Sequence, residues 1–405
     1  MLRIVLAAAG SAAALATSPA VLLNNAAAPG VFMPVTGLGT GGYCAKGQPG
    51  PSGQCECWGE SDGCGATSYN ATLAYLQLAW SMGERNIRID NADSYDNLGS
   101  VGKAIADSGV PRANIFLTTK TGSPFPLGYD DTLNQFNNVL TTMGVSYVDL
   151  CLCVRSLSPR RSCPRPTPTI LTPFEHARFE HFLRSIHWPQ ESGTSKDATC
   201  NPGASQNATE CRLNTWRAYV DIFNSGKARA IGVSNYDPSQ MQEIIDAGMP
   251  LPAVNQIPIH IYRSSTQMNS ISFSQRHGIA VNSYSPLGVP DWQSFNTSAG
   301  MSLTALQDPV VTAVAAKHGA SPAQVLSAWH YSLGLLPNPR TLNPAHMKEN
   351  LLAYTITISD AEVNLLTSRP QAFCSVMAGD YECAPDSLAS SARRAVRPGA
   401  RAAAA

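Results

Sequence analysis

The feature that most constrains the fold is a regular alternation of short apolar runs with stretches of helical periodicity. Eight short runs are predicted as strands: residues 31–37, 87–90, 115–120, 147–152, 230–233, 253–256, 279–284 and 335–337. Between and after them, apolar spacing predicts helices over residues 71–83, 100–108, 132–143, 214–225, 238–247, 266–277, 309–318, 322–333 and 344–354. Such alternation implies a parallel sheet with right-handed crossovers. Eight strand candidates favour closure into an α/β fold, the (β/α)8 TIM barrel.

Ionisable side chains stand at the ends of the predicted strands. Asp90 ends the second strand, Lys120 ends the third, and Tyr95 follows Asp90 by five residues. His187 lies in a later apolar stretch, Ile-His-Trp-Pro. Each alone has an ordinary structural explanation: a surface turn, a solvated lysine or a core histidine. Their joint occurrence points to a site, because a (β/α)8 barrel carries its chemistry at the C-terminal ends of its strands.

Together these four side chains can deliver a proton to a carbonyl oxygen. A free phenol has a pKa of about 10, and a nearby ammonium group lowers such a value by stabilising the phenolate. We therefore predict Tyr95 as general acid, Lys120 and Asp90 as the pair that tunes it, and His187 as the group that orients the substrate. A hydride has to come from a cofactor, since no side chain supplies one.

The run Ile-Asp-Asn-Ala-Asp-Ser-Tyr-Asp-Asn at residues 89–97 resembles the signature of the aldo-keto reductase family. Lys120 and the Ile-His-Trp-Pro stretch match the family's strand-three lysine and strand-four histidine. Further matches follow in family order, over roughly residues 31–368: Ala230-Ile-Gly-Val-Ser-Asn235, Val254-Asn-Gln256, Tyr284-Ser-Pro-Leu-Gly288, and Asn343-Pro with Lys348-Glu-Asn350. The resemblance implies an oxidoreductase, similar to the NADP+-dependent alcohol dehydrogenases, that reduces a small-molecule aldehyde or ketone with NADPH. It also implies Trp188 as a substrate contact.

The resemblance further implies a set of cofactor contacts. The residues in question are Gly39, Thr40, Ser234, Asn235, Gln256, Tyr284, Ser285, Leu287, Arg340, Thr341, His346 and Asn350. In the family, these positions serve the turn after the first strand, the nicotinamide, the pyrophosphate, the 2′-phosphate and the adenine. Arg340 offers a forked donor for a 2′-phosphate. His346 stands where the family usually has a second arginine, so NADP(H) is favoured less firmly than with both basic residues.

Two other functions stay open on the sequence alone. The first is a catalytically impaired or non-catalytic member of the same fold that binds cofactor and acts as an interaction protein. The second is a disulfide-rich secreted binding module, which uses the cysteine loops and explains none of the strand-end residues. The match of residues 37–42 to G-x-G-x-x-G is weak evidence for a dinucleotide fold, because no helix-forming stretch follows it.

The N-terminus and the cysteines favour entry into the secretory pathway. Residues 1–20 read as a signal peptide, with a small-residue cleavage site at Ala14-Leu15-Ala16. An uncleaved anchor through about Leu23 and a plastid transit peptide are the alternatives. Sequons at Asn70, Asn207 and Asn296, each placed in a loop or at a loop edge, predict a glycoprotein. Eight cysteines are expected in disulfides, with Cys151 as a buried thiol and a zinc site as the less favoured explanation: Cys44, Cys55, Cys57, Cys64, Cys200, Cys211, Cys374 and Cys383.

Residues 153–185 interrupt the pattern and are predicted to be a retained intron. The family runs directly from its fourth strand into the histidine, and deleting these thirty-three residues joins Leu152 to Ile186 without a gap. The deletion also removes Cys153 and Cys163. The alternative is a true loop insertion, which would then have to enter inside a strand, where backbone groups need ladder partners.

The remaining predictions concern boundaries and partners. The barrel is expected over residues 31–372, ending in a helix with a capping box at Ser359 and Glu362. The tail, residues 373–405, is expected to be largely disordered, because it has too few apolar side chains for a core. Equal numbers of basic and acidic residues, 28 and 28, speak against a nucleic-acid partner. We expect a monomer without stable membrane insertion after processing.

Overall fold

A computed structural model describes residues 18–23, 30–41, 65–122, 127–154, 200, 208–262, 265–288 and 305–369. Within these residues eight parallel strands form one sheet, in which every strand pairs with its neighbours in chain order. The strands are β3 (Gly37–Gly39), β4 (Ile87–Asp90), β5 (Ile115–Gly122), β6 (Leu150–Val154), β7 (Ile231–Ser234), β8 (Val254–Pro258), β9 (Ala280–Tyr284) and β10 (Leu335–Asn338).

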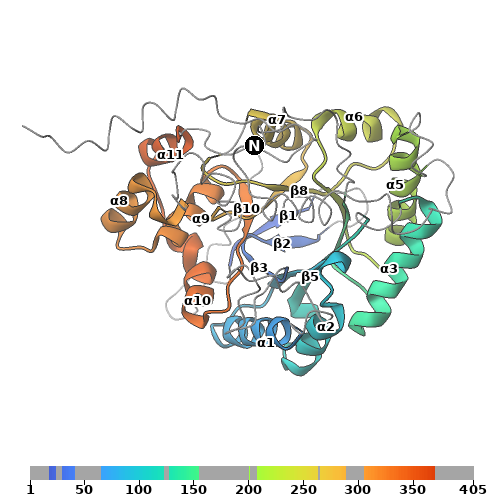
Figure 1. Cartoon of the computed structure of the whole chain (residues 1–405), viewed down its shortest axis with the longest axis horizontal. Coiled ribbons are helices and arrows are strands. Elements are labelled where there is room, and N and C mark those ends of the chain that lie inside the picture. Colours follow the sequence, from blue (N-terminus) through green and yellow to red (C-terminus); the bar gives the residue numbers. More distant parts are fainter. Residues whose placement is uncertain are drawn as a thin grey trace, which may run out of the picture.

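Helices surround this sheet on its outside (Figure 1). They are α1 (Gly65–Ser81), α2 (Leu98–Asp107), α3 (Tyr129–Met143), α5 (Ala208–Asn224), α6 (Pro238–Asp246), α7 (Ser265–Arg276), α8 (Pro309–His318), α9 (Pro322–Ser332), α10 (Pro344–Leu352) and α11 (Asp360–Thr367). The predicted (β/α)8 barrel is confirmed. The predicted capping box is present as well, since Ser359 Oγ accepts from Glu362 N and the Glu362 side chain accepts from Ser359 N.

Alternate residues of each strand face opposite sides of the barrel wall. Ile89, Leu117 and Cys151 pack in a cluster with residues of the surrounding helices. Leu152, from the same wall, belongs to a second cluster that fills the barrel interior. Because the period is two, Asp90 and Lys120 point to the interior. Two predicted site residues are therefore inside the barrel and at its C-terminal end.

The barrel closes between its first and last strands. Gly39 N–H donates to Pro339 O over 3.0 Å, and the guanidinium of Arg88 donates to Pro337 O over 2.6 Å from inside the barrel. A Cβ on Gly37 would lie 2.4 Å from Arg88 Nε, so this close approach requires glycine. Arg88 is fully buried, and burial lowers its pKa to about 10. A buried cation thus ties β10 to β4 across the seam.

A two-stranded antiparallel hairpin packs against the N-terminal ends of the barrel strands. Its second strand occupies part of the run 31–37 that was predicted as the first barrel strand, whereas the first barrel strand is β3 at Gly37–Gly39. The hairpin consists of β1 (Ala20–Leu22) and β2 (Phe32–Pro34), which lie near the middle of Figure 1. Val21 and Met33 are buried in the interior cluster. Ser18 N–H and Oγ donate to the Glu84 carboxylate over 2.8 and 2.7 Å, and burial raises the pKa of Glu84. Described structure that packs with the barrel therefore begins at Ser18, ahead of the expected barrel start at residue 31.

Leu23, at the end of the segment considered as an uncleaved anchor, is only 2% exposed and packs with the barrel interior. No helix in the described part of the chain is long and apolar enough to cross a membrane.

Two helices begin earlier than predicted. The helix predicted from residue 214 begins as α5 at Ala208 and includes Cys211. The first sequon was placed in a loop or at a loop edge, but Asn70 lies within α1, on an exposed face. The other two sequons lie outside the described residues, as does the tail from residue 370.

Strand β6 ends two residues later than predicted, at Val154 instead of residue 152, and so includes the start of the suspected insertion. Cys153 pairs with Thr121 and Val233, and Val154 pairs with Gly122 and Ser234. The objection that an insertion would break a strand is therefore wrong, because the backbone ladder is complete before residue 155. Cys151 is a buried thiol as predicted, and Cys153 is a second one, whose pKa burial raises to about 11.

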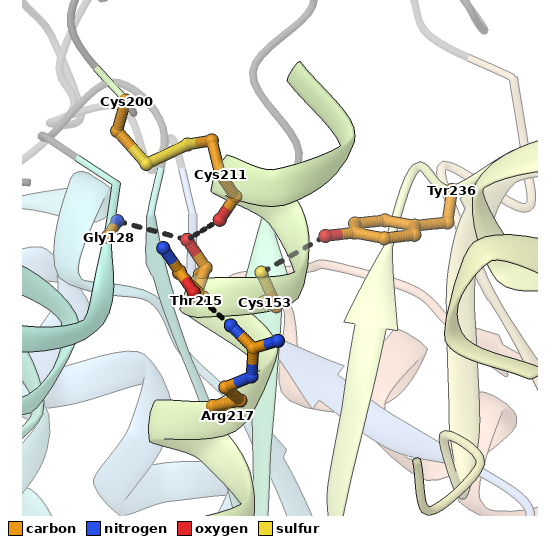
Figure 2. The surroundings of a disulfide bond; sticks show 8 residues. Gly128, Cys153, Cys200, Cys211, Thr215, Arg217 and Tyr236 are labelled. Atoms are coloured by element: carbon orange, nitrogen blue, oxygen red, sulfur yellow. Dashed lines mark hydrogen bonds between the residues drawn. A yellow bond between two sulfur atoms is a disulfide. The ribbon is translucent and has the colours of Figure 1, made fainter. Parts of the chain in front are cut away.

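Two of the eight cysteines expected in disulfides are bonded to each other. Cys200 and Cys211 are bonded, with 4.9 Å between their Cα atoms. Figure 2 shows the bond above Thr215, whose Oγ1 donates to Cys211 O and accepts from Gly128 N. The disulfide therefore ties residue 200 to the first turns of α5, and the hydrogen bond from Gly128 to Thr215 joins α5 to the segment that leads into α3. The other six cysteines expected in disulfides lie outside the described residues.

Replacing both Cys200 and Cys211 by serine is expected to lower Tm by several degrees. Closing a loop of about this size contributes roughly 3 kcal/mol by restricting the unfolded chain. Thermal unfolding followed by circular dichroism tests this, with a reductant as the control: it should lower the Tm of the wild type more than that of the variant, in which only the other expected disulfides can be reduced. Equal Tm values for both proteins without reductant would contradict the expectation.

Candidate functional site

The centre of the site is an ammonium group held between a carboxylate and a phenol, at the C-terminal ends of β4 and β5. Lys120 Nζ donates to Asp90 Oδ1 and, over 2.9 Å, to Asn91 O. The same Nζ lies 3.2 Å from the hydroxyl oxygen of Tyr95. Lys120 is 4% exposed and Asp90 1% exposed, so the ion pair is withdrawn from water. Three of the four residues predicted to carry the chemistry are thus in direct contact.

The surroundings of Lys120 keep it charged. Burial by itself lowers the pKa of a lysine, because it penalises the ammonium form. The charge of Asp90 and the hydrogen bonds to Asp90 and Tyr95 outweigh burial, so the pKa of Lys120 is raised above its usual value. A fixed positive charge beside the phenol oxygen stabilises the phenolate that remains after a proton has been donated.

Asp90 is also held from its second oxygen. Gln256 Nε2 donates to Asp90 Oδ2 over 2.6 Å and also to Asn282 Oδ1. Asn282 Nδ2 in turn donates to Leu336 O over 2.5 Å. This buried row links β4, β8, β9 and β10 and fixes the carboxylate against Lys120. The sequence analysis did not identify Asn282. The alternation of side chains along a strand could have done so, because Asn282 lies two residues before Tyr284 and therefore on the same face of β9.

Tyr95 lies in a short 3-10 turn, Asp93–Tyr95, that follows β4. Asp96 closes the turn with a left-handed backbone, φ 51°, which aspartate tolerates better than most residues. Burial raises the pKa of Asp93 to about 6. The Tyr95 ring rests against Gly41, where an added Cβ would lie 2.9 Å from the ring. Gly41 was not singled out on the sequence, because nothing local to it indicates this contact.

The turn after β3 connects the first strand to this centre. Thr40 N and Oγ1 both donate to Asp90 O, each over 3.0 Å. A Cβ on Gly39 would contact Asn338 and Pro339 at the end of β10. The two residues predicted here for the cofactor, Gly39 and Thr40, therefore line the seam beside Asp90.

The predicted nicotinamide and pyrophosphate residues lie at the ends of β7 and β9. Asn235 and Ser285 follow these strands with left-handed backbones, φ 62° and 52°. Tyr284 donates its hydroxyl to Asn235 Oδ1 over 3.1 Å, and burial raises its pKa. Ser234 Oγ donates to Gln256 O over 3.1 Å, and Leu287 is partly buried. The structure thus gathers these predicted residues at the same end of the barrel as Lys120.

The predicted 2′-phosphate residues come from the segment after β10. Arg340 is exposed and donates to Gly41 O over 2.5 Å. Thr341 Oγ1 accepts from Asn343 N over 3.1 Å. His346 is exposed in the first turn of α10. Asn350 is 5% exposed, and its Oδ1 has no partner among the described residues.

Two predicted residues, His187 and Trp188, lie outside the described residues. Within those residues β6 ends on Val154, whose backbone pairs with Gly122 and Ser234. Val154 is on the same face of β6 as Leu152, which belongs to the interior cluster. Strand β6 therefore brings an apolar side chain to the end of the barrel where Asp90 and Lys120 lie.

Comparisons with known proteins agree with this geometry. The sequence profile of the Aldo/keto reductase family matches residues 57–369. Morphine 6-dehydrogenase of Pseudomonas putida is 31% identical over 346 residues, which cover 85% of this chain and 89% of that protein. Glycerol 2-dehydrogenase (NADP(+)) of Saccharomyces cerevisiae is 29% identical over 302 residues, 74% of this chain and 84% of that protein.

Solved structures show the same fold. An aldo/keto reductase from Brucella melitensis is 26% identical with a TM-score of 0.57, covering 87% of this chain and 99% of that one. A Bombyx mori aldo-keto reductase in complex with NADP is 23% identical with a TM-score of 0.62, covering 88% and 94%. The barrel, the buried Asp90–Lys120–Tyr95 contact and the profile match over most of the chain lead to one conclusion: the chain belongs to the aldo/keto reductase family.

Proposed function

We propose that the protein reduces an aldehyde or ketone to an alcohol with NADPH, with Tyr95 as the proton donor. The observation that carries this proposal is the position of Lys120 Nζ, bonded to Asp90 and 3.2 Å from the Tyr95 hydroxyl. NADPH, when bound, supplies a hydride with its electron pair to the carbonyl carbon. Tyr95 gives its proton to the carbonyl oxygen, and solvent then returns a proton to the phenolate. The electrons balance, because the carbonyl gains two and NADPH becomes NADP+.

Each neighbour of Tyr95 has a part in this step. Lys120 lowers the free energy of the phenolate through its charge. Asp90, fixed by Gln256, holds the ammonium group in place and keeps it protonated. Because both charges are buried, their interaction is screened less by water than a surface pair would be. The site is therefore organised before substrate arrives, which is how enzymes stabilise charge that develops in a transition state.

The residues present fit NADP(H). Arg340 is exposed on the segment between β10 and α10. Thr341 is next to it, and His346 lies in the first turn of α10. The buried Asn350 Oδ1, without a partner among the described residues, is an acceptor that could bond an adenine amine. Two similar proteins point the same way: the yeast protein is a glycerol 2-dehydrogenase (NADP(+)), and the Bombyx mori aldo-keto reductase was solved in complex with NADP.

Arg340→Ala is expected to raise KM for NADPH about ten- to a hundred-fold and to change KM for NADH much less. A charge-assisted hydrogen bond contributes roughly 1.5–3 kcal/mol, and NADH lacks the phosphate that would receive it. Initial rates with each cofactor test this, and Arg217→Ala on α5 serves as the control for loss of a surface arginine. Equal losses for both cofactors would refute the assignment.

The proposed reaction is tested by following NADPH absorbance with a generic aromatic aldehyde and purified protein. Consumption that depends on both the aldehyde and the protein supports a reductase. Tight NADPH binding without consumption supports the alternative, a catalytically impaired member of the family that acts as an interaction protein. The apolar end of β6 at Val154 favours this alternative for the full chain, because the wall next to Lys120 then supplies no imidazole from that strand.

Secretory entry is proposed with a corrected boundary. Cleavage after Ala16 would leave Ser18 in place, so its two hydrogen bonds to Glu84 would survive. The disulfide between Cys200 and Cys211 supports an oxidising compartment. N-terminal sequencing of the mature protein tests the proposal, and a mature protein that begins at Met1 or after Leu23 would contradict it.

A further inference from the structure

The segment that carries Tyr95 begins and ends on asparagines. Asn91 follows β4 directly, and Asn97 precedes α2. Both side chains are fully buried, at 0% exposure, although asparagine is mostly a surface residue. Burying an amide is costly unless it is hydrogen-bonded. The bonds that these two amides make therefore show what the segment is fixed to.

Asn97 ties the end of this segment to two other elements. Its Nδ2 donates to Thr40 O over 2.8 Å and to Ser68 Oγ over 3.1 Å. Its Oδ1 accepts from Asn91 Nδ2 over 2.8 Å. The side chain thus bonds the turn after β3, helix α1 and the start of its own segment. One amide uses both donors and its acceptor in this arrangement.

Asn91 connects the same network to the reacting groups. Its Nδ2 also donates to Thr40 Oγ1 over 2.9 Å, and its backbone oxygen accepts from Lys120 Nζ over 2.9 Å. Its Oδ1 has no partner among the described residues, so the amide is oriented by its two donor bonds. A continuous path of hydrogen bonds therefore runs from Ser68 on α1 to the ammonium group beside Tyr95.

The bonds inside the Tyr95 turn fix only its shape. Tyr95 N–H donates to Ala92 O over 3.1 Å, and Asp96 N–H donates to Asp93 O over 3.3 Å. Such local bonds would persist if the turn shifted as a whole. The bonds of Asn91 and Asn97 to Thr40 are different, because they join this turn to another strand end. They therefore determine where the phenol lies relative to Lys120.

We propose that Asn97, acting through Asn91 and Thr40, is a positioning residue that holds the Tyr95 hydroxyl at Lys120. The proposal rests on the proposed reduction, since Tyr95 is placed for proton donation. The network also bonds Thr40, which precedes Gly41, and the Tyr95 ring rests on Gly41. The same bonds thus set the ring against both of its neighbours. A displacement of about 1 Å in such a site can cost roughly 100-fold in rate.

The test uses two substitutions of different kinds. Asn97→Ala removes all three bonds. Asn97→Asp keeps the shape and the acceptor but places an oxygen opposite Thr40 O, so it separates lost packing from lost hydrogen bonding. Thr215→Val is the matched control: Thr215 on α5 is 1% exposed and joins Gly128 to Cys211 by two hydrogen bonds (Figure 2), neither of which involves residues 91–97.

Two measurements distinguish positioning from general stability. In steady-state carbonyl reduction, both Asn97 variants should lower kcat about 10- to 100-fold and leave KM for NADPH within about two-fold. In cofactor-free protein, hydrogen exchange of the peptide with residues 92–97 should become several-fold faster, while that of β5 is unchanged. Thr215→Val should keep wild-type kcat and wild-type exchange over residues 92–97, even if its Tm falls.

The outcomes separate the two proposals. Wild-type kcat and wild-type hydrogen exchange in Asn97→Ala would overturn the positioning role. A fall in kcat in Asn97→Ala alone, with wild-type kcat in Asn97→Asp, would also overturn it, because it would indicate that the side chain acts through packing and not through its donor bonds. A wild type that consumes no NADPH would count against the proposed reaction instead. The exchange comparison would then still decide whether Asn97 holds the turn, because it needs neither cofactor nor substrate.

Discussion

Tyr95→Phe should lower kcat for carbonyl reduction about 1,000-fold and leave the Kd for NADPH unchanged. The substitution removes one oxygen, the one that lies 3.2 Å from Lys120 Nζ, and general acid catalysis contributes roughly 10²–10⁴-fold. The ring can stay against Gly41, because phenylalanine keeps the same contacts. Steady-state rates give kcat, and quenching of protein fluorescence by NADPH gives Kd.

Tyr129→Phe is the matched control for this experiment. Its hydroxyl donates to Asp221 Oδ2 over 2.6 Å between α3 and α5, on the outside of the barrel. It should keep wild-type kcat. A Tyr95→Phe variant that retains more than about a tenth of the wild-type rate would show that another group supplies the proton, and the proposed mechanism would fall.

Deleting residues 153–185 should raise kcat/KM for carbonyl reduction about 100-fold over that of the full chain. In the deleted chain Ile186 follows Leu152, so the register of β6 gives it the place of Cys153 and gives His187 the place of Val154. Cys153 is buried in the cluster that faces the helices, where isoleucine is also apolar. Val154 is on the face that leads to the barrel mouth, where an imidazole could orient a carbonyl oxygen.

In the deleted chain, the alternation of side chains along β6 therefore still directs Ile186 towards the helices and His187 towards the barrel mouth. A deletion one residue longer or shorter would reverse this alternation and turn the His187 side chain towards the helices. The control is the same deletion combined with His187→Val, which restores the apolar side chain at the strand end. Its rate should return to that of the full chain. Equal rates for the full and the deleted chain, together with transcripts that retain these codons, would show that the insertion is a genuine loop after a complete strand.

The sequence by itself determined the repeating units and the ionisable side chains at their ends. Strands β4 and β5 could be predicted because short apolar runs are local patterns, and Asp90 and Lys120 mark where those runs stop. The capping box at Ser359 could be predicted for the same reason, since both of its bonds join residues three apart. Tyr95 could be placed because it follows β4 so closely that no other element intervenes.

The tertiary structure decided what depends on contacts between distant residues. Ser18 bonds to Glu84 across 66 positions of the chain, so only the folded structure shows that the segment from Ser18 onward packs with the barrel. Cys153 and Val154 became strand residues because Thr121 and Ser234 offer ladder partners, which no local pattern shows. Asn97 has ordinary loop neighbours in sequence, and only its bond to Thr40, 57 positions away, reveals its part in the site. Local periodicity sets which segments become strands and helices, whereas burial and hydrogen bonding between the folded segments set which polar side chains act together.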